Sequence, residues 1–476
     1  MTDKFMTELF ERDEESIMLI DSSRQYNYST VKNDMNGLYS RINKRVIALF
    51  LCSNTYESIM GYLSCLMNRV VPILVSENIS EIYLENILEN YKPEFIWMPM
   101  KFNVSGDINS IVTEYTGKYV FENYILLKRN KIEKYKIHDD LALLLTTSGT
   151  TGSLKLVRIS YENIKENTRQ IINSLNMNSS NIGITILPMN YTYGLSVINT
   201  HLFVGGKIVI ADKGIYRKEF WDLVTKYKCD SLYGVPYIYE MIIKFGYMKK
   251  MPDCVKYLTQ AGGYLRQAYK KKIVEFCKDN NIEFYVMYGQ TEATARISCM
   301  NLTKNTDKIE SIGKALDNIE CCFNNDGEMI IKGKNVSLGY AYDYTDLKKG
   351  NDNMGVLNTG DVISVDSEGY LYWKGRNDSY GKILGKRINL NDINRKIERD
   401  CGICDFVSFI NNDKLLIYIE KDIFKGQRDL DEDVSKKINR IMHENTELTD
   451  KMYNIRFIDK IPRLENGKVD YKGLKL

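Results

Sequence analysis

The sequence predicts an α/β protein with a large N-terminal domain of parallel sheets flanked by helices, a β-rich layer and a small α+β domain at the C-terminus. First, short apolar or β-branched runs alternate with longer amphipathic stretches from about Arg45 to Tyr288, as in βαβ units. Second, the pattern between Asn301 and Trp373 changes to short strands broken by Gly, Asn and Asp. Third, a charged turn after Gly375 leads into a module of about 100 residues.

The alternating part predicts buried parallel strands, because such strands are apolar along their whole length. The expected strands are Arg45–Cys52, Val70–Leu74, Leu141–Thr146, Gly183–Leu187, Lys207–Ala211, Ser231–Val235, Val255–Thr259 and Glu283–Met287. Amphipathic spacing between them predicts helices at Tyr161–Leu175, Arg217–Tyr227, Pro236–Phe245 and Leu265–Asp279. The proline that begins the third of these helices suits a first turn, where no backbone N–H is needed.

The rest of the chain predicts two smaller units. NNDGEMIIKG and DSEGYLYWKG place turn residues between strand formers, and they predict hairpins of a β-rich subdomain at about 301–377. The C-terminal module is expected to hold two helices and two strands, at Asn391–Asp400, Asp431–Glu444, Phe406–Ile410 and Leu415–Glu420. We place the boundary near Asp378, which gives a large domain of residues 1–377 and a small domain of residues 378–476.

Composition excludes several classes of protein. The 476 residues include 65 Lys and Arg against 62 Asp and Glu, and this near-neutral balance makes nucleic acid an unexpected partner. Hydrophobic residues at 44% and charged residues at 27% are typical of a globular protein. No apolar run approaches the roughly 18 residues of a membrane helix, and the acidic N-terminus does not resemble a signal peptide. Ten scattered cysteines favour reduced thiols, so we expect a cytoplasmic protein without a membrane span.

The most informative stretch follows the strand predicted at Leu141–Thr146. It reads TTSGTTGSLK and combines small hydroxyl residues, two glycines and one lysine. Glycines let backbone N–H groups turn toward one centre, hydroxyls add donors and lysine adds positive charge, so the loop suits a triphosphate. The spacing Gly149-x-x-Gly152-x-x-Lys155 differs from that of the common P-loop, G-x-x-x-x-G-K-[ST]. A flexible Ser/Thr/Gly linker is the alternative interpretation.

A second polar cluster, YGQTE, follows the strand predicted at Glu283–Met287. Tyr288 and Glu292 would therefore lie at the carboxyl end of a strand, where open α/β sheets bind ligands. The aromatic ring can stack on a base, and the carboxylate can hold Mg²⁺ on phosphate oxygens. The alternative to a binding role is that Tyr288 packs in the core and Glu292 is a solvated surface acid.

Six motifs in order resemble those of one family. TTSGTTGSLK, YGQTE, GEMIIKG…GY, NTGD ending at Asp361, GRND ending at Asp378 and NGK ending at Lys468 match the order and approximate spacing of the AMP-forming adenylating superfamily. This superfamily includes acyl-CoA synthetases, peptide-synthetase adenylation domains and luciferases. The resemblance covers the chain from about Leu141 to the end, and six ordered motifs are far more specific than one.

The resemblance implies a site for ATP and Mg²⁺. The β- and γ-phosphates would be held by Thr147, Ser148, Gly149, Thr150, Thr151, Gly152 and Lys155. The remaining nucleotide contacts would come from Gly262, Gly263, Tyr288, Gly289, Thr291, Glu292, Asp361 and Arg376. In this assignment the glycine pair lies against adenine, Tyr288 stacks on it, Thr291 contacts the α-phosphate and Glu292 ligates Mg²⁺. Asp361 accepts both ribose hydroxyls, with the arginine as a cationic fork nearby.

The resemblance also implies a small mobile α+β C-terminal domain that serves two half-reactions. Lys468 would stabilise charge on the α-phosphate while a carboxylate displaces pyrophosphate. Asp378 occupies the hinge position, and rotation about it would replace Lys468 with another face of the domain. Lys382 and Gly385 would enter in the second, thioester-forming arrangement. The alternative for Lys468 is a surface lysine in a tail turn. The alternative for the segment with Lys382 and Gly385 is an ordinary basic loop.

The acyl pocket is implied by position in the family. Its expected lining is Tyr191, Tyr193, Gly194, Pro236 and Met287. Peptide-synthetase domains for α-amino acids place an aspartate in the segment that here reads PMNYTYG, which has no acid. This absence disfavours a free α-amino acid, because a buried ammonium would lack a partner, and it favours an uncharged carboxylic acid. Tyr191 stands where many acyl-CoA synthetases have histidine.

The function predicted from the resemblance is that of an acid–thiol ligase. It would activate a small carboxylic acid with ATP to an acyl-adenylate, release pyrophosphate and pass the acyl group to the phosphopantetheine thiol of CoA or of a carrier protein in trans. The alternative is a stand-alone adenylation domain that loads an aryl or unusual amino acid onto a carrier protein. A third hypothesis, an adenylate-binding protein without chemistry, is disfavoured by the presence of Lys468, Glu292 and Asp361 together.

Overall fold

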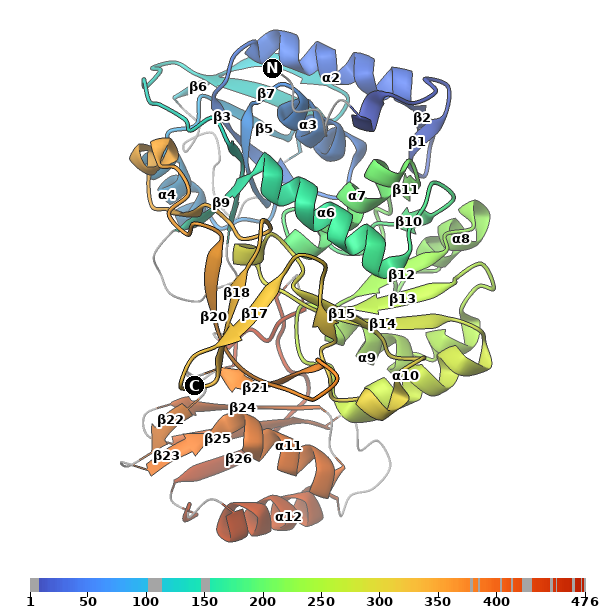
Figure 1. The fold of residues 1–476 in the computed structure, drawn as a ribbon, viewed down its shortest axis with the longest axis vertical. Helices are drawn as coiled ribbons and strands as arrows, with labels where there is room; N and C mark the ends of the chain where they lie inside the picture. Colours follow the sequence, from blue (N-terminus) through green and yellow to red (C-terminus); the bar gives the residue numbers. More distant parts are fainter. Residues whose placement is uncertain are drawn as a thin grey trace.

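The computed structural model describes most of the chain. The described residues are 8–101, 114–146, 155–376, 380–383, 386–402, 405–411, 414–421, 430–445, 448–450, 452–464, 467–471 and 473–474. We use the term large lobe for the part up to residue 376 and small lobe for the part from residue 380 onward. Figure 1 shows the small lobe below the large lobe.

Two mixed sheets form most of the large lobe (Figure 1). The first contains, in spatial order, β16 (Lys314–Ala315), β15 (Ser298–Asn301), β14 (Glu283–Tyr288), β13 (Tyr257–Gln260), β12 (Ser231–Gly234), β10 (Ile182–Ile184), β11 (Lys207–Val209), β1 (Ile17–Ile20) and β2 (Gln25–Asn27). The second contains β19 (Gly339–Ala341), β9 (Leu156–Ser160), β8 (Leu141–Thr146), β4 (Val71–Ser76), β3 (Ile47–Cys52), β5 (Phe95–Pro99), β7 (Tyr124–Arg129) and β6 (Tyr115–Phe121).

The α/β fold class is confirmed, but the sheets are parallel only at their centres. Pairs from β1 to β14 through β11, β10, β12 and β13 are parallel, as are β5–β3–β4–β8. Antiparallel strands complete the edges, for example β15 beside β14 and β9 beside β8. The central strands are buried along their length, which explains their continuous apolar sequences. Edge strands alternate less regularly and were harder to predict.

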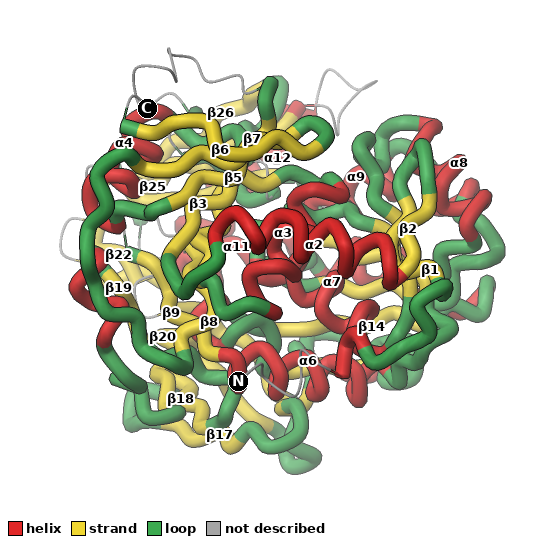
Figure 2. The backbone as a smooth tube through the Cα atoms, turned by 90° about the horizontal axis from the view of Figure 1, so that it is seen from above, coloured by secondary structure: helices red, strands yellow, loops and turns green. Residues whose placement is uncertain are grey.

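Helices cover the faces of both sheets. Their bounds are α2 (Tyr28–Ile42), α3 (Tyr56–Met67), α4 (Glu81–Tyr91), α6 (Tyr161–Leu175), α7 (Thr192–Val204), α8 (Lys218–Tyr227), α9 (Pro236–Lys244) and α10 (Gln267–Asp279). One core cluster joins both sheets through α2, α3, α6 and α7, and Figure 2 shows these helices together. The other face of the first sheet packs on α8, α9 and α10, and the other face of the second sheet packs on α4. The large lobe is therefore built in five layers.

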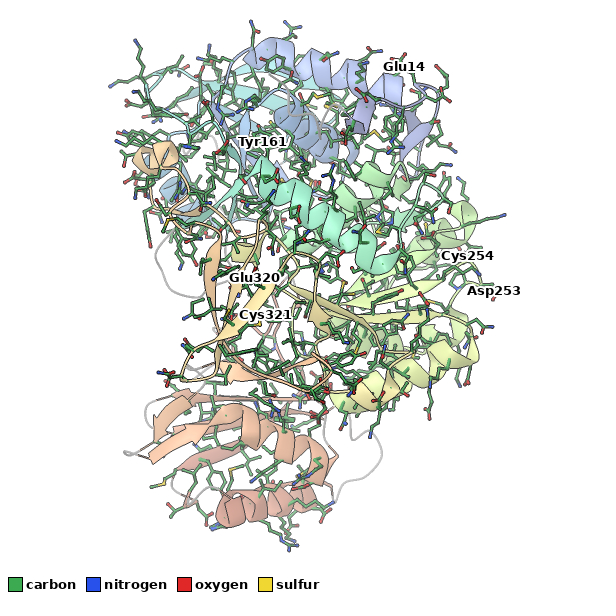
Figure 3. The ribbon with its side chains drawn as sticks, in the orientation of Figure 1. Glu14, Tyr161, Asp253, Cys254, Glu320 and Cys321 are labelled. Atoms are coloured by element: carbon green, nitrogen blue, oxygen red, sulfur yellow. The ribbon has the colours of Figure 1, made fainter. Side chains whose placement is uncertain are left out.

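Local sequence explains where the central helix α6 begins. Ser160 caps it and accepts a hydrogen bond from the Asn163 N–H, while the Asn163 side chain accepts one from the Ser160 N–H. Tyr161, labelled in Figure 3, is the first helical residue and is buried in the core shared by the two sheets. The same asparagine donates to the carbonyl of Val336, so the cap also holds the segment before β19. The cap therefore fixes the start of α6 directly after β9.

A third, antiparallel sheet forms the β-rich layer predicted near 301–377. It contains β17 (Glu320–Phe323), β18 (Glu328–Lys332), β20 (Val356–Val365) and β21 (Leu371–Arg376). The small lobe contains β22 (Tyr380–Ile383), β23 (Lys386–Asn389), α11 (Leu390–Cys401), β24 (Phe406–Asn411), β25 (Lys414–Glu420), α12 (Leu430–Asn445) and β26 (Tyr453–Ile458). Its side chains form a hydrophobic cluster of their own. Within the described residues, no helix has both the length and the apolar character needed to cross a membrane.

Candidate active site

A cavity of about 840 Å³ lies where β13 and β14 end and the β-rich layer begins. Its wall includes Gln260–Leu265 at the end of β13, Val286–Glu292 at the end of β14, and residues 357–361 of β20. Trp373 and Arg376 of β21 and Lys468 of the small lobe also line it. Segments far apart in the sequence therefore meet at the carboxyl ends of parallel strands, which is where open α/β sheets bind ligands.

Asp361 is the most heavily hydrogen-bonded acid of the cavity. Only 3% of this residue is exposed, and its carboxylate accepts hydrogen bonds from Tyr288 Oη at 2.6 Å, Trp373 Nε1 at 2.9 Å and Arg376 Nε at 3.0 Å. Burial, together with the nearby carboxylate, raises the pKa of Tyr288 well above its usual value. The tyrosine therefore stays protonated and acts as a donor. The indole partner was not predicted.

Glu292 faces the same cavity from η2 (Thr291–Ala293), the short 3₁₀ turn after β14. Tyr340 Oη of β19 donates to Glu292 Oε1 at 2.7 Å. The ammonium of Lys155 lies 4.0 Å from the centre of the Tyr340 ring. Tyr340 belongs to the GY pair of the third motif, and the structure shows that it links the acid of YGQTE to the lysine of the glycine-rich loop. The neighbouring Thr291 also lines the cavity.

Lys468 enters the cavity on a tight turn of the small lobe. Arg463 and Val469 form an antiparallel bridge, and the Leu464 N–H donates to the Lys468 carbonyl at 2.8 Å. Gly467 has a φ of +79°, and a Cβ at that position would lie 2.8 Å from Val235, so glycine allows the turn to approach the large lobe. Burial and, next, the Arg376 charge lower the pKa of Lys468, while Glu292 acts in the opposite direction.

The two glycines of the TQAGG segment lie beside the ends of β12 and β13. Gly262 has a φ of +80°, and a Cβ there would lie 2.3 Å from the hydroxyl of Tyr191. Glycine is thus required both by the backbone and by the close approach of a cavity-lining ring. Pro236 begins α9 and packs against Gly263, behind the cavity wall.

The residues predicted for the acyl pocket separate into two groups. Tyr191, Tyr193 and Met287 line the cavity. Gly194 instead lies near the start of α7, where a Cβ would meet the carbonyl of Pro188 at 2.4 Å. The Tyr193 hydroxyl donates to the Thr259 carbonyl at 2.8 Å, which holds its ring in place.

Several predicted residues fall outside the described part of the chain. Thr147, Ser148, Gly149, Thr150, Thr151 and Gly152 are in this group, together with Asp378 and Gly385. The backbone of Lys382 is described in β22, but its side chain is not. The roles of these residues stay predictions from sequence.

Two buried cations of the cavity wall were missed by the sequence analysis. Arg296 is 3% exposed, and its guanidinium carbon lies 3.9 Å from the centre of the Tyr193 ring. Lys270 of α10 is equally buried and donates to the Ile309 carbonyl at 3.1 Å. Burial lowers the pKa of Lys270 to about 8. One signal in the sequence was available for Arg296, which stands between Ala295 and Ile297 in a run of small and apolar residues.

The large and small lobes are joined by ion pairs whose acidic partners are buried. Lys244 at the end of α9 lies 3.0 Å from Asp405 and 3.4 Å from Glu420, and both acids belong to the small lobe. Arg463 pairs with Glu240 of α9 at 3.1 Å. These contacts hold the small lobe in the arrangement in which Lys468 lines the cavity.

A nucleotide-sized cavity with these groups, at the carboxyl ends of parallel strands, defines a nucleotide-binding α/β enzyme. A family model described as AMP-binding enzyme matches residues 10–341, and the chain belongs to this family. The predicted membership of the AMP-forming adenylating superfamily is thereby confirmed.

Known proteins similar to this chain agree with the family. A 2-succinylbenzoate–CoA ligase of Staphylococcus epidermidis is 23% identical over 350 residues, which cover 69% of this chain and 67% of that protein. An oxalate–CoA ligase of Saccharomyces cerevisiae is 25% identical over 395 residues, covering 78% and 70%, respectively. Among solved structures, an o-succinylbenzoate CoA synthetase of Bacillus subtilis in complex with an acyl-adenylate intermediate has a TM-score of 0.75 at 18% identity, covering 99% of this chain and 97% of that one. The last similarity shows that the two chains share a fold over nearly their whole length.

Proposed function

We propose that this enzyme is an AMP-forming acid–thiol ligase that uses CoA as the acyl acceptor. In the first half-reaction a carboxylate oxygen attacks the α-phosphorus of ATP, an acyl-adenylate forms and pyrophosphate leaves. In the second, a thiol sulfur attacks the acyl carbonyl carbon and AMP leaves. The observation that supports this proposal most is that Lys468, Glu292 and Asp361, from three separate motifs, line one cavity.

The nucleoside part of ATP fits the wall that contains Tyr288 and Asp361. In this proposal the base lies between the Tyr288 ring and the backbone of Gly262 and Gly263, and Asp361 accepts the two ribose hydroxyls. Its carboxylate is already fixed by three donors, so little ordering is needed when ribose binds. Arg376 adds a positive charge beside it.

The triphosphate would lie between Lys155 and Thr291, with the sequence-predicted loop of residues 147–152 around its β- and γ-phosphates. Mg²⁺ commonly takes one or two protein carboxylates and completes its shell with phosphate oxygens and water. Glu292 fits this pattern, because Tyr340 holds one of its oxygens and its side chain borders the cavity. When bound there, Mg²⁺ would offset negative charge on the phosphates. Within the described residues, no cluster of three or more metal-ligating side chains offers another site.

Lys468 is the proposed catalytic residue of the first half-reaction. Its ammonium would stabilise the charge that develops on the α-phosphate oxygens as pyrophosphate leaves. Electrostatic contacts of this kind are typically worth about 10²–10³ in rate. Burial and Arg376 lower the pKa of Lys468 in the free protein, and the anionic triphosphate would act in the opposite direction by favouring the charged ammonium.

The second half-reaction would require the small lobe to turn about Asp378. We propose that this lobe is the mobile domain of residues 378–476, and that Lys382 and Gly385 enter the site for thioester formation. Its separate hydrophobic cluster supports movement as a unit. The links between the lobes that would have to break are mainly polar.

CoA is favoured as acceptor because the relatives reported above are named CoA ligases. Transfer to a carrier protein, or loading of an aryl or unusual amino acid onto such a protein, is the competing outcome. Incubation of enzyme, ATP and acid with CoA or with a phosphopantetheinylated carrier protein distinguishes them, because only the true acceptor yields thioester at a rate matching pyrophosphate release.

Two variants test whether Lys468 and Gly385 serve different half-reactions, as proposed. Lys468→Ala should lower acid-dependent ATP–pyrophosphate exchange by about 10²–10³-fold and leave thioester formation from supplied acyl-AMP nearly unchanged. Gly385→Leu should show the opposite pattern. Equal losses of both half-reactions in each variant would contradict the proposal, and so would the absence of ATP binding by titration calorimetry with magnesium present.

A further inference from the structure

Arg296 is a buried cation that the proposed reaction leaves without a role. Its side chain borders the cavity although the residue is only 3% exposed, and its Nε is enclosed without an acceptor. Within the described residues its guanidinium forms no ion pair. Phosphate contacts are already assigned to Lys155, Thr291 and Lys468, so an additional buried charge calls for another explanation.

The backbone at Arg296 is held firmly. Asn167 of α6 accepts a hydrogen bond from the Arg296 N–H at 3.1 Å and donates to its carbonyl at 2.8 Å. Asn335 donates to the same carbonyl at 3.3 Å, and both asparagines are fully buried. The guanidinium rests on the Tyr193 ring, which is itself hydrogen-bonded to Thr259. The cation is therefore positioned before any ligand binds.

The surroundings of Arg296 carry no compensating negative charge among the described groups. The groups that act on it most strongly after burial are Tyr193, Tyr191 and Cys299, which are neutral near pH 7. Burial lowers the pKa of the guanidinium, yet arginine starts so high that it keeps its proton at neutral pH. An isolated buried charge is costly unless a partner arrives, and guanidinium forks match carboxylates in two parallel hydrogen bonds.

The location of Arg296 indicates which part of a substrate it meets. It follows the 3₁₀ turn that carries Glu292, and the chain folds back so tightly that Gly289 contacts the Ala295 carbonyl. Its side chain lies with Tyr191 and Tyr193, the residues predicted for the acyl pocket. The ribose acid Asp361 has its own arginine partner.

We propose that the acid activated by this enzyme carries a second carboxylate, distal to the one that is adenylated, and that Arg296 binds this distal carboxylate. The proposal rests on the proposed ligase function and makes its substrate class specific. It also replaces the expectation of an uncharged acid, which was based only on the lack of an acidic residue in PMNYTYG.

The test compares dicarboxylic acids with monocarboxylic acids of equal length in ATP–pyrophosphate exchange. The panel runs from succinate to suberate against butyrate to octanoate, with phthalate against benzoate as an aromatic pair. Removing one partner of a buried charge pair in a binding site typically costs a factor of about 10² or more. We therefore expect kcat/KM of the best diacid to exceed that of its monoacid by about that factor.

Variants assign this preference to the guanidinium. Arg296→Met should lower kcat/KM for the diacid by about 10²-fold, mainly through KM, and leave the monoacid unchanged or improved. Arg296→Lys should recover part of the diacid activity because it keeps the charge. Arg169→Met, which removes a half-exposed arginine of α6, is the matched control and should leave both activities unchanged.

Other outcomes would overturn the inference. A wild type that prefers monoacids, or that uses no diacid of the panel, would exclude a distal carboxylate. Equal loss with both acid classes in Arg296→Met would mean that Arg296 serves the common chemistry instead. The unfolding temperature of the apo variant should not fall, since an uncompensated charge is removed. If ATP binds and monoacids react, only this inference fails; if ATP does not bind at all, the proposed function fails with it.

Discussion

Lys244→Met should slow the first half-reaction while sparing the second. Lys244 lies between the lobes, 3.0 Å from Asp405 and 3.4 Å from Glu420, and both acids are largely buried. Burial opposes the charge of Lys244, but the two acids outweigh it and raise its pKa. Methionine keeps the length and apolar stem of the side chain and removes only the ammonium. Both carboxylates then stay buried without this cation in the arrangement that brings Lys468 into the cavity.

The size of the effect follows from burial. Removing one partner of a fully buried ion pair costs about 3–5 kcal/mol. Lys244 is 27% exposed, so we take about 2–3 kcal/mol, which lowers the equilibrium constant that favours this arrangement by roughly 30- to 160-fold. ATP–pyrophosphate exchange should fall by up to about that factor, whereas thioester formation from supplied acyl-AMP should change little.

The matched control is Lys218→Met. Lys218 pairs with Asp222 at 2.7 Å on the exposed face of α8, where solvent screens the two charges and the pair adds little to stability. Exchange in this variant should stay within about twofold of the wild type. If Lys244→Met slowed both half-reactions equally, or neither, the ion pairs would not control the position of the small lobe.

Three further predictions concern the cavity wall. Gly289→Ala places a Cβ 1.9 Å from the Ala295 carbonyl, so it should cost about 1–3 kcal/mol in chemical denaturation and weaken ATP binding, while Gly37→Ala inside α2 should be neutral or stabilising. Burial lowers the pKa of Lys270 from 10.5 to about 8 in the folded protein. Between pH 8 and 10.5 the unfolded chain therefore binds more protons than the folded protein, so the free energy of unfolding should rise with pH over this range. Lys270→Met should abolish this rise and gain up to about 3 kcal/mol at pH 7; an unchanged difference between variant and wild type at pH 7 and pH 9.5 would contradict the assignment. Asp361→Asn turns an amide toward three donors and should weaken ATP binding at least about tenfold by calorimetry, without loss of folded protein at pH 7.

The fold was predictable where burial leaves a simple pattern. The strand expected at Leu141–Thr146 is observed with the same bounds, because a buried strand between polar segments is apolar throughout. Edge strands such as Glu320–Phe323 are largely exposed and mix polar with apolar residues, so the sequence offers no comparable signal. The antiparallel pairing of β14 with β15 depends on a chain reversal that periodicity does not report.

The candidate site was predictable where chemistry follows a motif. Tyr288, Glu292, Asp361 and Lys468 each belong to a recognisable string, and the structure brings all four to one cavity. Arg296 could not be assigned in the same way, because its importance depends on burial beside residues distant in sequence. A lone arginine in a sequence is usually a surface residue, and only the fold shows that this one is enclosed.

The hydrogen bonds that hold the backbone at position 296 have a consequence for how the substrate specificity of such an enzyme could evolve. Asn167 and Asn335 form hydrogen bonds with main-chain atoms, so any amino acid except proline would keep them at this position. If Arg296 selects the acid as proposed, one substitution at this position would change the accepted acid, while the backbone hydrogen bonds next to the turn with Glu292 remain. Relatives that accept different acids would then differ at residue 296 and keep the residues proposed for catalysis.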